Sequence, residues 1–365
     1  MPTNRTLIAL AVAAILPLWV LAQEPTAPPA GTEGAEPPTE AESLLDQAII
    51  KLKQLETAQA DLRQDVEMLG QQFAVVGRYE KAPGRRLRME LQVQGLPASS
   101  GNMKQVSDGK TLWDYFEILD QQYYSRLDLT QVFQKLDDPV FDELTRAVFM
   151  DQLGMSGPDS LLQGLRQAAR FVQSPEVAEL DGRAVHILRG EWKDMSVMGA
   201  PSGPAPGPMA LLPAYIPRLV EVWVGQEDGW PYKVVLQGKK RPIIAQKQQF
   251  RIGHDGRPQG PALSTDDEPP SKFILTYSNV DLDPHFGPNA FDFRPPADVR
   301  VEDTTGDRIA QLEQFAQILS AQQTSEAARE DTLLDGAIRV PPLGPEPEPL
   351  GSPPRDTPPA TVAPR

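Results

Sequence analysis

Apolar and polar residues alternate with a period of two along much of residues 71–282. In the clearest stretch the apolar positions are Leu87, Met89, Leu91 and Val93, and the residues between them are charged or polar. One apolar and one polar face is typical of an antiparallel strand with one face in water. Similar patterns predict strands over 73–80, 103–107, 111–118, 121–127, 184–191, 218–225, 231–237, 243–252 and 272–282. This succession of strands predicts a large antiparallel sheet.

Three Asp-Gly pairs separate strand patterns: Asp108-Gly109, Asp181-Gly182 and Asp228-Gly229. Both residue types tolerate the positive φ that tight hairpin turns need. We therefore predict three hairpins at these pairs.

Residues 43–69 carry apolar residues at three- and four-residue spacing, which predicts one helix that ends before Gly70. The positions in this stripe are Leu45, Ala48, Leu52, Leu55, Gln59, Leu62, Val66 and Leu69. Two interpretations follow. The stripe packs on the sheet, which we favour because Gln59 interrupts it, or it forms a coiled coil that makes a weak dimer.

Helical patterns also interrupt the strands once, within residues 128–172. Asp138-Pro139 and Pro158-Asp159 are typical helix starts, because proline is tolerated in the first turn. Helices inserted between two sets of strands are expected to cover one face of the sheet. A curved sheet with helices across its open side would enclose an apolar cavity.

The two ends of the chain differ from the part between them. Arg5 and the apolar run 7–21 predict a secretory signal over residues 1–22, cleaved after Ala22. An uncleaved anchor is the alternative, although the run is short for a membrane span and Pro17 interrupts it. Residues 23–42 and 333–365 are rich in proline and read as disordered segments. A helix is predicted over 306–332, and the main domain over 43–305.

The composition of the chain argues against several classes of function. The chain has 365 residues, no cysteine and a net charge of −15. Without cysteine there is no acylation site of the lipoprotein type, no disulfide and no thiol nucleophile. The acidic balance argues against a nucleic-acid partner, which requires a basic face. We expect an exported protein that is soluble in the periplasm after cleavage of the signal.

Three segments resemble the outer-membrane lipoprotein carrier (LolA/LolB-like) family, and they occur in the order of that family. They are Glu80–Glu90, with a proline before an amphipathic strand, Ser107–Tyr115, with Ser-Asp-Gly-Lys-Thr-Leu-Trp, and Phe291–Val301, which is similar to the closing Phe-x-Phe-x-Pro-Pro strand of the family. Together they bracket residues 71–303. The resemblance implies an α+β fold: an unclosed antiparallel β half-barrel with a helical lid, a hydrophobic cavity for acyl chains, and no catalysis or cofactor.

Within such a fold, residues in the apolar strand phase are expected to line the cavity. They are Leu87, Met89, Leu91, Val93, Trp113, Tyr115, Phe273, Leu275 and Tyr277. The apolar positions of the helical region are expected to form the lid. They are Phe141, Leu144, Val148, Leu161 and Leu165.

The chain departs from the family at one position. Carriers usually have an arginine immediately before the proline of the first segment, where it hydrogen-bonds to the lid, and this chain has Ala82 there. Lys81, Arg85 and Arg86 are the candidates for a contact with the lid or with a lipid headgroup. The alternative for these basic residues is the solvated face of a strand.

Signals for other chemistry are weak. His186, His254 and His285 lie far apart and lack the spacing of metal ligands. The Asp281–Asp283 pair lacks the glycine turn and distal glutamate of a calcium loop. No phosphate-binding glycine loop and no nucleophile elbow are present.

The sequence therefore predicts an envelope protein, not an enzyme, that binds a lipid or an acylated protein noncovalently. A membrane-bound loading or receiving protein is an expected partner. The alternative function is a protein-interaction or envelope-sensor module that uses the 43–69 helix and the tails.

Overall fold

A computed structural model describes residues 37–337 except 69, 97–100, 119–120, 143–144, 147–148, 151–152, 156, 194–216 and 239–269. The described helices are α3 (Glu40–Gln54), α4 (Leu129–Leu136), α6 (Pro158–Ala168) and α7 (Thr305–Ala337). The strands are β1 Ala58–Met68, β2 Gln71–Ala82, β3 Arg86–Gln94, β4 Gly101–Asp108, β5 Thr111–Ile118, β6 Gln121–Asp128, β7 Ala169–Arg170, β8 Glu176–Leu180, β9 Arg183–Trp192, β10 Pro217–Gly225, β11 Pro231–Gly238, β12 Lys272–Asp281 and β13 Val301–Asp303.

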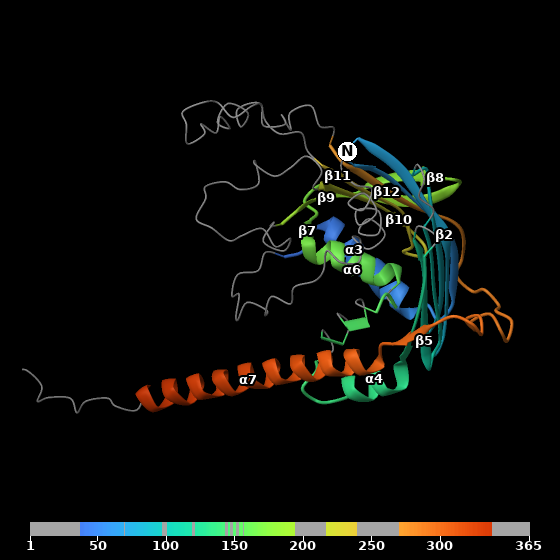
Figure 1. Ribbon diagram of the computed structural model, residues 1–365. Helices are drawn as coiled ribbons and strands as arrows, with labels where there is room; N and C mark the ends of the chain where they lie inside the picture. Colours follow the sequence, from blue (N-terminus) through green and yellow to red (C-terminus); the bar gives the residue numbers. More distant parts are fainter. Residues whose placement is uncertain are drawn as a thin grey trace, which may run out of the picture. The chain divides into compact units, whose positions relative to one another are not determined.

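All these strands belong to one sheet, ordered β13-β6-β5-β4-β3-β2-β1-β12-β11-β10-β9-β7, with β8 also paired to β9. Neighbours are antiparallel, except that β13 runs parallel to β6. Within the described residues the two ends of this order are not paired with each other, so the sheet is unclosed. The predicted fold class, an α+β half-barrel with helices on one side, is confirmed (Figure 1).

The concave face of the sheet carries the apolar strand positions. Val93 of β3 lies opposite Val75 of β2, Val75 opposite Gln64 of β1, and Gln64 opposite Leu275 of β12. Directly paired residues share a face, because side chains alternate between the two faces of a strand. Figure 1 shows α3 and α6 side by side on this face, and residues of both helices join its hydrophobic core.

Helix α3 begins with a capping box in which Thr39 and Glu42 satisfy each other's backbone N–H groups. Its apolar stripe, Leu45, Ala48 and Leu52, is buried in the core. The interpretation that this stripe packs on the sheet is confirmed for these three positions. The stripe is therefore not available for a dimeric coiled coil.

The predicted helix over 43–69 is wrong beyond Gln54, because residues 58–68 form β1, a strand inside the sheet. Ala58, Ala60, Gln64 and Val66 are buried, whereas the residues between them are at most half-buried and, apart from Leu62, polar. This alternation has a period of two. Leu62 and Val66 are four residues apart, so they satisfy the strand period and the helical spacing equally, and the helical interpretation extended too far.

An ion-pair network fastens α3 to α6 at one end of the helix pair. Arg166 of α6 lies 3.4 Å from Glu42 and 3.1 Å from Asp46 of α3. The Thr39 hydroxyl donates a 2.5 Å hydrogen bond to the carbonyl oxygen of Phe171, just beyond α6. We refer to these contacts as the clamp. The clamp joins the start of α3 to the end of α6, so the two helices run antiparallel and their other ends lie together.

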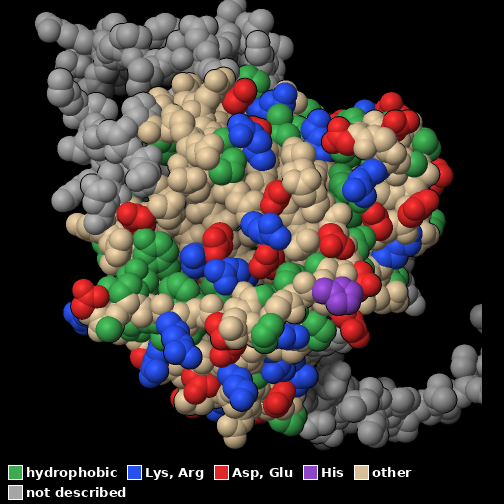
Figure 2. Space-filling model, turned by 90° about the vertical axis from the view of Figure 1, so that its right-hand side faces the viewer, with side chains coloured by type: hydrophobic (Ala, Val, Ile, Leu, Met, Phe, Trp, Pro, Cys, Tyr) green, Lys and Arg blue, Asp and Glu red, His purple; other side chains and the backbone are tan. Residues whose placement is uncertain are grey.

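The convex face is charged. Glu90 of β3 pairs with Arg88 of the same strand at 2.9 Å and with Lys104 of the neighbouring β4 at 3.1 Å. Within β2, Arg78 pairs with Glu80 at 2.7 Å. Figure 2 shows positive and negative side chains interspersed over one side of the protein. Arg88, Glu90 and Lys104 therefore form an ion-pair network on the face opposite the hydrophobic core.

The segment after β12 crosses part of this convex face. Phe291 is buried against Phe286, with 5.0 Å between ring centroids, and Arg88 donates a hydrogen bond to the Ala290 carbonyl. The resemblance implies a closing strand over 291–301. That expectation is wrong, because pairing begins only at Val301, where β13 adds to β6.

The chain divides into two units, Met1–Glu313 and Gln314–Arg365, and the boundary falls within α7. Helix α7 covers the helix predicted over 306–332. In the first unit, Leu312 is buried and Glu313 lies 3.3 Å from Lys135 of α4.

Within the described residues, no helix combines the length and apolarity that crossing a membrane requires. The signal predicted over 1–22, the strand predicted over 243–252 and nearly all of the tail predicted over 333–365 lie outside the described residues.

Candidate functional site

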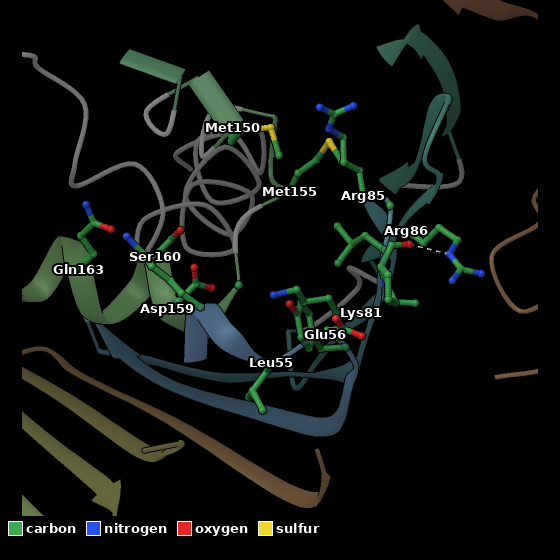
Figure 3. A pocket seen from close by; sticks show the side chains of 17 residues that line it. Leu55, Glu56, Lys81, Arg85, Arg86, Met150, Met155, Asp159, Ser160 and Gln163 are labelled. Atoms are coloured by element: carbon green, nitrogen blue, oxygen red, sulfur yellow. Dashed lines mark hydrogen bonds between the residues drawn. The ribbon is translucent and has the colours of Figure 1, made fainter. Parts of the chain in front are cut away.

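A pocket of about 400 Å³ opens where the free ends of α3 and α6 meet the β2–β3 hairpin (Figure 3). Its apolar lining includes Leu55, after α3, Leu87 of β3, and Met150 and Met155 from the segment before α6. The pocket lies at the end of the helix pair opposite the clamp. Its volume falls within the range of small-molecule sites.

The β2–β3 hairpin forms one wall of the pocket. Its loop, Pro83–Arg85, places Gly84 and Arg85 at φ of 79° and 63°, in the left-handed region. This conformation is unusual for arginine, but two contacts hold it. The Ser107 hydroxyl donates to the Arg85 carbonyl at 2.7 Å, and the guanidinium lies 3.7 Å from the centre of the Phe133 ring of α4. Arg85 therefore contacts the helical region, as the sequence suggested for one of three basic residues.

The other two candidates lie differently. Lys81 of β2 is half-buried, and Figure 3 shows it pointing into the pocket, whose lining also includes Glu56 and Asp159. Arg86 also borders the pocket, but its guanidinium donates to the Pro83 carbonyl at 2.9 Å and lies 5.5 Å from the Phe291 ring centre. Lys81 is thus the basic residue best placed inside the pocket.

Tyr79 of β2 is the deepest polar residue of the pocket, with 4% of its surface exposed. Burial, and secondarily the nearby Asp159 carboxylate, raises the pKa of Tyr79 well above its ordinary value. The phenol therefore stays protonated and can donate a hydrogen bond at neutral pH.

The register of the sheet places seven of the predicted cavity residues on one face, where they contribute to the concave core or lie beside it. They are Leu87, Met89, Leu91, Val93, Phe273, Leu275 and Tyr277. Six are buried and Leu91 is half-buried. Only Leu87 also lines the pocket described above.

Trp113 and Tyr115 do not share this face. Trp113 lies opposite Val106, which lies opposite Arg88, so all three face the convex side. There Trp113 contacts Phe293, with 6.0 Å between ring centroids, and Tyr115 stacks on Tyr124 at 4.8 Å. Their assignment to the cavity is wrong. Apolarity misled it, because the concave positions of β5 are Leu112, Asp114 and Phe116, and Trp113 and Tyr115 between them face the other side.

Among the predicted lid residues, Leu161 and Leu165 are buried in the concave core, and Phe141 is buried as well. Leu144 and Val148 lie outside the described residues. Helices α4 and α6 lie within the predicted lid region 128–172, but α3, which precedes the strands, covers the concave face together with α6.

Sequence reasoning missed Tyr79, Lys53, Leu55 and Gly157, which also line the pocket. Tyr79 could have been found from the sequence, because it lies two residues before Lys81 on the same face of the strand, close to the hairpin. The others come from helix ends that meet this hairpin only in the folded chain.

A second polar group lies on the concave face of β4–β6. Gln105 donates hydrogen bonds to Asp114 at 2.8 Å and to the Leu153 carbonyl at 2.9 Å, which ties the segment before α6 to the sheet. Burial raises the pKa of Asp114, although Gln105, Arg308 and Ser125 partly oppose the shift.

We expect Asp114→Asn to raise the melting temperature at pH 7. A pKa raised in the folded state means that this group's contribution to stability is greatest below its unfolded pKa and is lost as pH rises through the folded value. Asn removes the buried charge and keeps an oxygen that accepts from Gln105. The gain should shrink toward pH 3.8, the ordinary value of the pKa. Melting curves at both pH values would measure this, with Asp137→Asn at an exposed position as control. A loss of stability at pH 7 would contradict the prediction.

No cluster of three or more His, Asp or Glu side chains in the described part of the chain is placed to hold a metal ion. His186 lies in β9, His285 is exposed after β12, and His254 is outside the described residues. Asp281 accepts a hydrogen bond from the Asp283 backbone, which accounts for this pair locally.

No protein-family model and no curated protein matches the chain. Solved structures match the chain at low similarity. Lipoprotein LppX of Mycobacterium tuberculosis is 12% identical and matches 67% of this chain and 98% of its own, with a TM-score of 0.32. LprF of Mycobacterium bovis is 15% identical and matches 70% of this chain and 100% of its own, with a TM-score of 0.33. A LolA superfamily protein of Nitrosomonas europaea is 15% identical and matches 69% of this chain and 97% of its own, with a TM-score of 0.21. The last belongs to the family that the sequence segments resemble. At these scores the matches assign no function and no residue role.

Proposed function

We propose that this chain is an exported, non-catalytic protein that binds the acyl chain of a lipid or of an acylated protein noncovalently in its half-barrel. The observation that carries the proposal is the pocket between the free ends of α3 and α6 and the β2–β3 hairpin. Apolar side chains, Leu55, Leu87, Met150 and Met155, line it. Methionine suits a site that adapts to flexible chains, because its side chain is unbranched and polarizable.

The helix pair offers a route from this pocket to the concave face. The clamp around Arg166 holds the start of α3 to the end of α6. At the pocket end, no ion pair joins the two helices within the described residues. We expect the helices to separate there, so that an acyl chain replaces helix side chains such as Leu52 against the sheet. The exchange costs little, because one apolar surface replaces another.

The cellular setting is part of the proposal. The signal predicted over residues 1–22 would deliver the chain to the periplasm, where it would act as a soluble carrier. A carrier needs a membrane-bound partner that loads or receives its lipid. The alternative, an interaction module built on a 43–69 helix, loses its structural basis because β1 occupies the second half of that segment.

Native mass spectrometry of the protein purified from its own envelope, followed by organic extraction, tests the proposal directly. A bound phospholipid or acylated peptide would support it and name the ligand class. A protein that carries no lipid and also fails to bind a fluorescent fatty acid would overturn it.

A series of alkyl maltosides tests the chain-binding step. Each buried methylene contributes about 0.8 kcal/mol, so two added methylenes should tighten binding roughly 15-fold until the site is filled. Titration calorimetry with octyl, decyl and dodecyl maltoside below their micelle concentrations measures this. Affinities that do not depend on chain length would argue against an apolar site.

The variant Leu55→Gln replaces an apolar pocket wall by a polar group of similar size. We expect it to weaken binding of dodecyl maltoside about tenfold, which corresponds to losing most of one buried leucine contact. The matched control is Val177→Gln on β8, because Val177 is 69% exposed and does not line the pocket. If both variants lost the same affinity for dodecyl maltoside, the assignment of Leu55 to the binding site would be wrong.

A further inference from the structure

We propose that the pocket also recognises the headgroup, by binding the phosphate or carboxylate of an anionic lipid between Lys81, Tyr79 and the start of α6. This inference rests on the proposed function, because the acyl chain of the same lipid would occupy the half-barrel. Four cationic side chains line the pocket, Lys53, Lys81, Arg85 and Arg86, against two acidic ones, Glu56 and Asp159. An anion with one or two charges offsets this excess.

Lys81 has no ion-pair partner among the residues that the structure describes. Neither Lys53 nor Lys81 forms an ion pair with any described residue, although the chain has a net charge of −15 and acidic side chains are abundant. On the convex face, by contrast, Arg78, Arg88 and Lys104 are all paired. A half-buried ammonium group that points into a pocket without a partner is suited to bind an anion from outside the chain.

Tyr79 provides an independent observation. Its side chain is more than nine-tenths buried, its hydroxyl lies at the pocket, and no described residue forms a hydrogen bond with that hydroxyl. The hydroxyl is therefore free to bond to a molecule that occupies the pocket. The phenol stays protonated at neutral pH, so an anionic oxygen is a matching acceptor.

The start of α6 completes the site. Its N-cap residue is Gly157, which offers no side chain to cap the first-turn N–H groups. A Cβ at this position would lie 2.7 Å from the Tyr79 hydroxyl and 2.8 Å from the Asp159 carboxylate. Glycine therefore lets the phenol and the Asp159 carboxylate lie beside the start of α6, whose N–H groups and helix dipole favour negative charge.

The apolar wall identifies the source of the anion. Leu55, Leu87, Met150 and Met155 border the same pocket, and a free phosphate ion would gain nothing from them. An amphiphile uses both parts of the lining, because its charged group reaches Lys81 and Tyr79 and its chain covers the apolar residues.

The test compares two ligands that share a twelve-carbon chain, dodecyl phosphate and dodecyl maltoside, by calorimetry on the full chain. We expect the wild type to prefer dodecyl phosphate about tenfold or more, because hydrogen bonds to charged groups are strong. Lys81→Met and Tyr79→Phe should each lose most of this preference and keep their affinity for the maltoside. Lys104→Met is the control, because Lys104 is also a half-buried strand lysine but lies on the convex face and pairs with Glu90.

Each outcome separates the two proposals. Equal affinity of the wild type for both ligands would overturn the headgroup site and leave acyl-chain binding intact. Failure to bind either ligand would overturn both. If inorganic phosphate displaced dodecyl phosphate at equal concentration, the pocket would be a site for free anions, and the assignment of the anion to a lipid headgroup would be wrong. A loss of preference in Lys104→Met equal to that in Lys81→Met would show a general charge effect and overturn the assignment of Lys81.

Discussion

Gly77→Ala is expected to destabilise the protein by about 3 kcal/mol, the upper part of the range for overpacking a filled site. Gly77 lies inside β2, between Leu62 of β1 and Leu91 of β3. A Cβ built there would overlap the backbone carbonyl oxygen of Glu90 and lie 2.7 Å from Cδ2 of Leu91. The carbonyl cannot yield without shifting β3, whose convex face carries the Arg88–Glu90–Lys104 ion pairs. Urea unfolding monitored by circular dichroism would measure the loss.

The matched control for this substitution is Gly164→Ala. Gly164 lies inside α6, and a Cβ there meets no atom within 4 Å. Because glycine costs helix stability, the alanine should raise the free energy of unfolding by about 0.5–1 kcal/mol. The same substitution should thus lower the free energy of unfolding at Gly77 and raise it at Gly164. If Gly77→Ala unfolded at the same urea concentration as the wild type, the close approach of β2 and β3 would be wrong.

The hairpins were the most predictable part of the fold. At Asp181-Gly182, both residues have positive φ, 49° and 78°, and Leu180 pairs with Arg183 across the turn. The predicted Asp108-Gly109 turn also forms, with Gly109 at φ 93° and the Asp108 carboxylate accepting from the Lys110 and Thr111 amides. Such turns are local, so a few residues determine them.

The face of each strand and the boundary between helix and strand were less predictable. Residues 58–68 fit both periods at Leu62 and Val66, and only their place between β2 and β12 decides for the strand. The face of the sheet on which Trp113 lies depends on how β5 pairs with its neighbours, and the sequence of β5 alone does not reveal this register. The pocket was harder to predict, because it joins the β2–β3 hairpin to the end of α3 and the start of α6, and these two helix ends lie about 100 residues apart in the chain. Lys81 and Leu87 could be named from the sequence, but their meeting with Gly157 could not.

Trp230→Ala is expected to lower the free energy of unfolding by about 3–5 kcal/mol, as large-to-small substitutions in a core do. Trp230 is 1% exposed and packs edge-on against Tyr277, with 5.5 Å between ring centroids. The preceding Gly229 lies against Ala48 of α3, where a Cβ would be 3.0 Å from the Ala48 Cα. The cavity would therefore open beneath the helix that covers the concave face, where the backbone is too closely packed to collapse into it.

Trp230→Phe separates packing from hydrogen bonding at the same position. The buried indole N–H of Trp230 has no hydrogen-bond partner among the described residues. Leaving such a group unsatisfied costs about 1–3 kcal/mol, so phenylalanine removes a penalty while it keeps an aromatic ring against Tyr277. We expect it to cost less than half as much as alanine in the same urea unfolding experiment. A loss as large as that of Trp230→Ala would mean that the indole N–H is satisfied in the folded protein, or that only the full indole fills the space between β11 and α3.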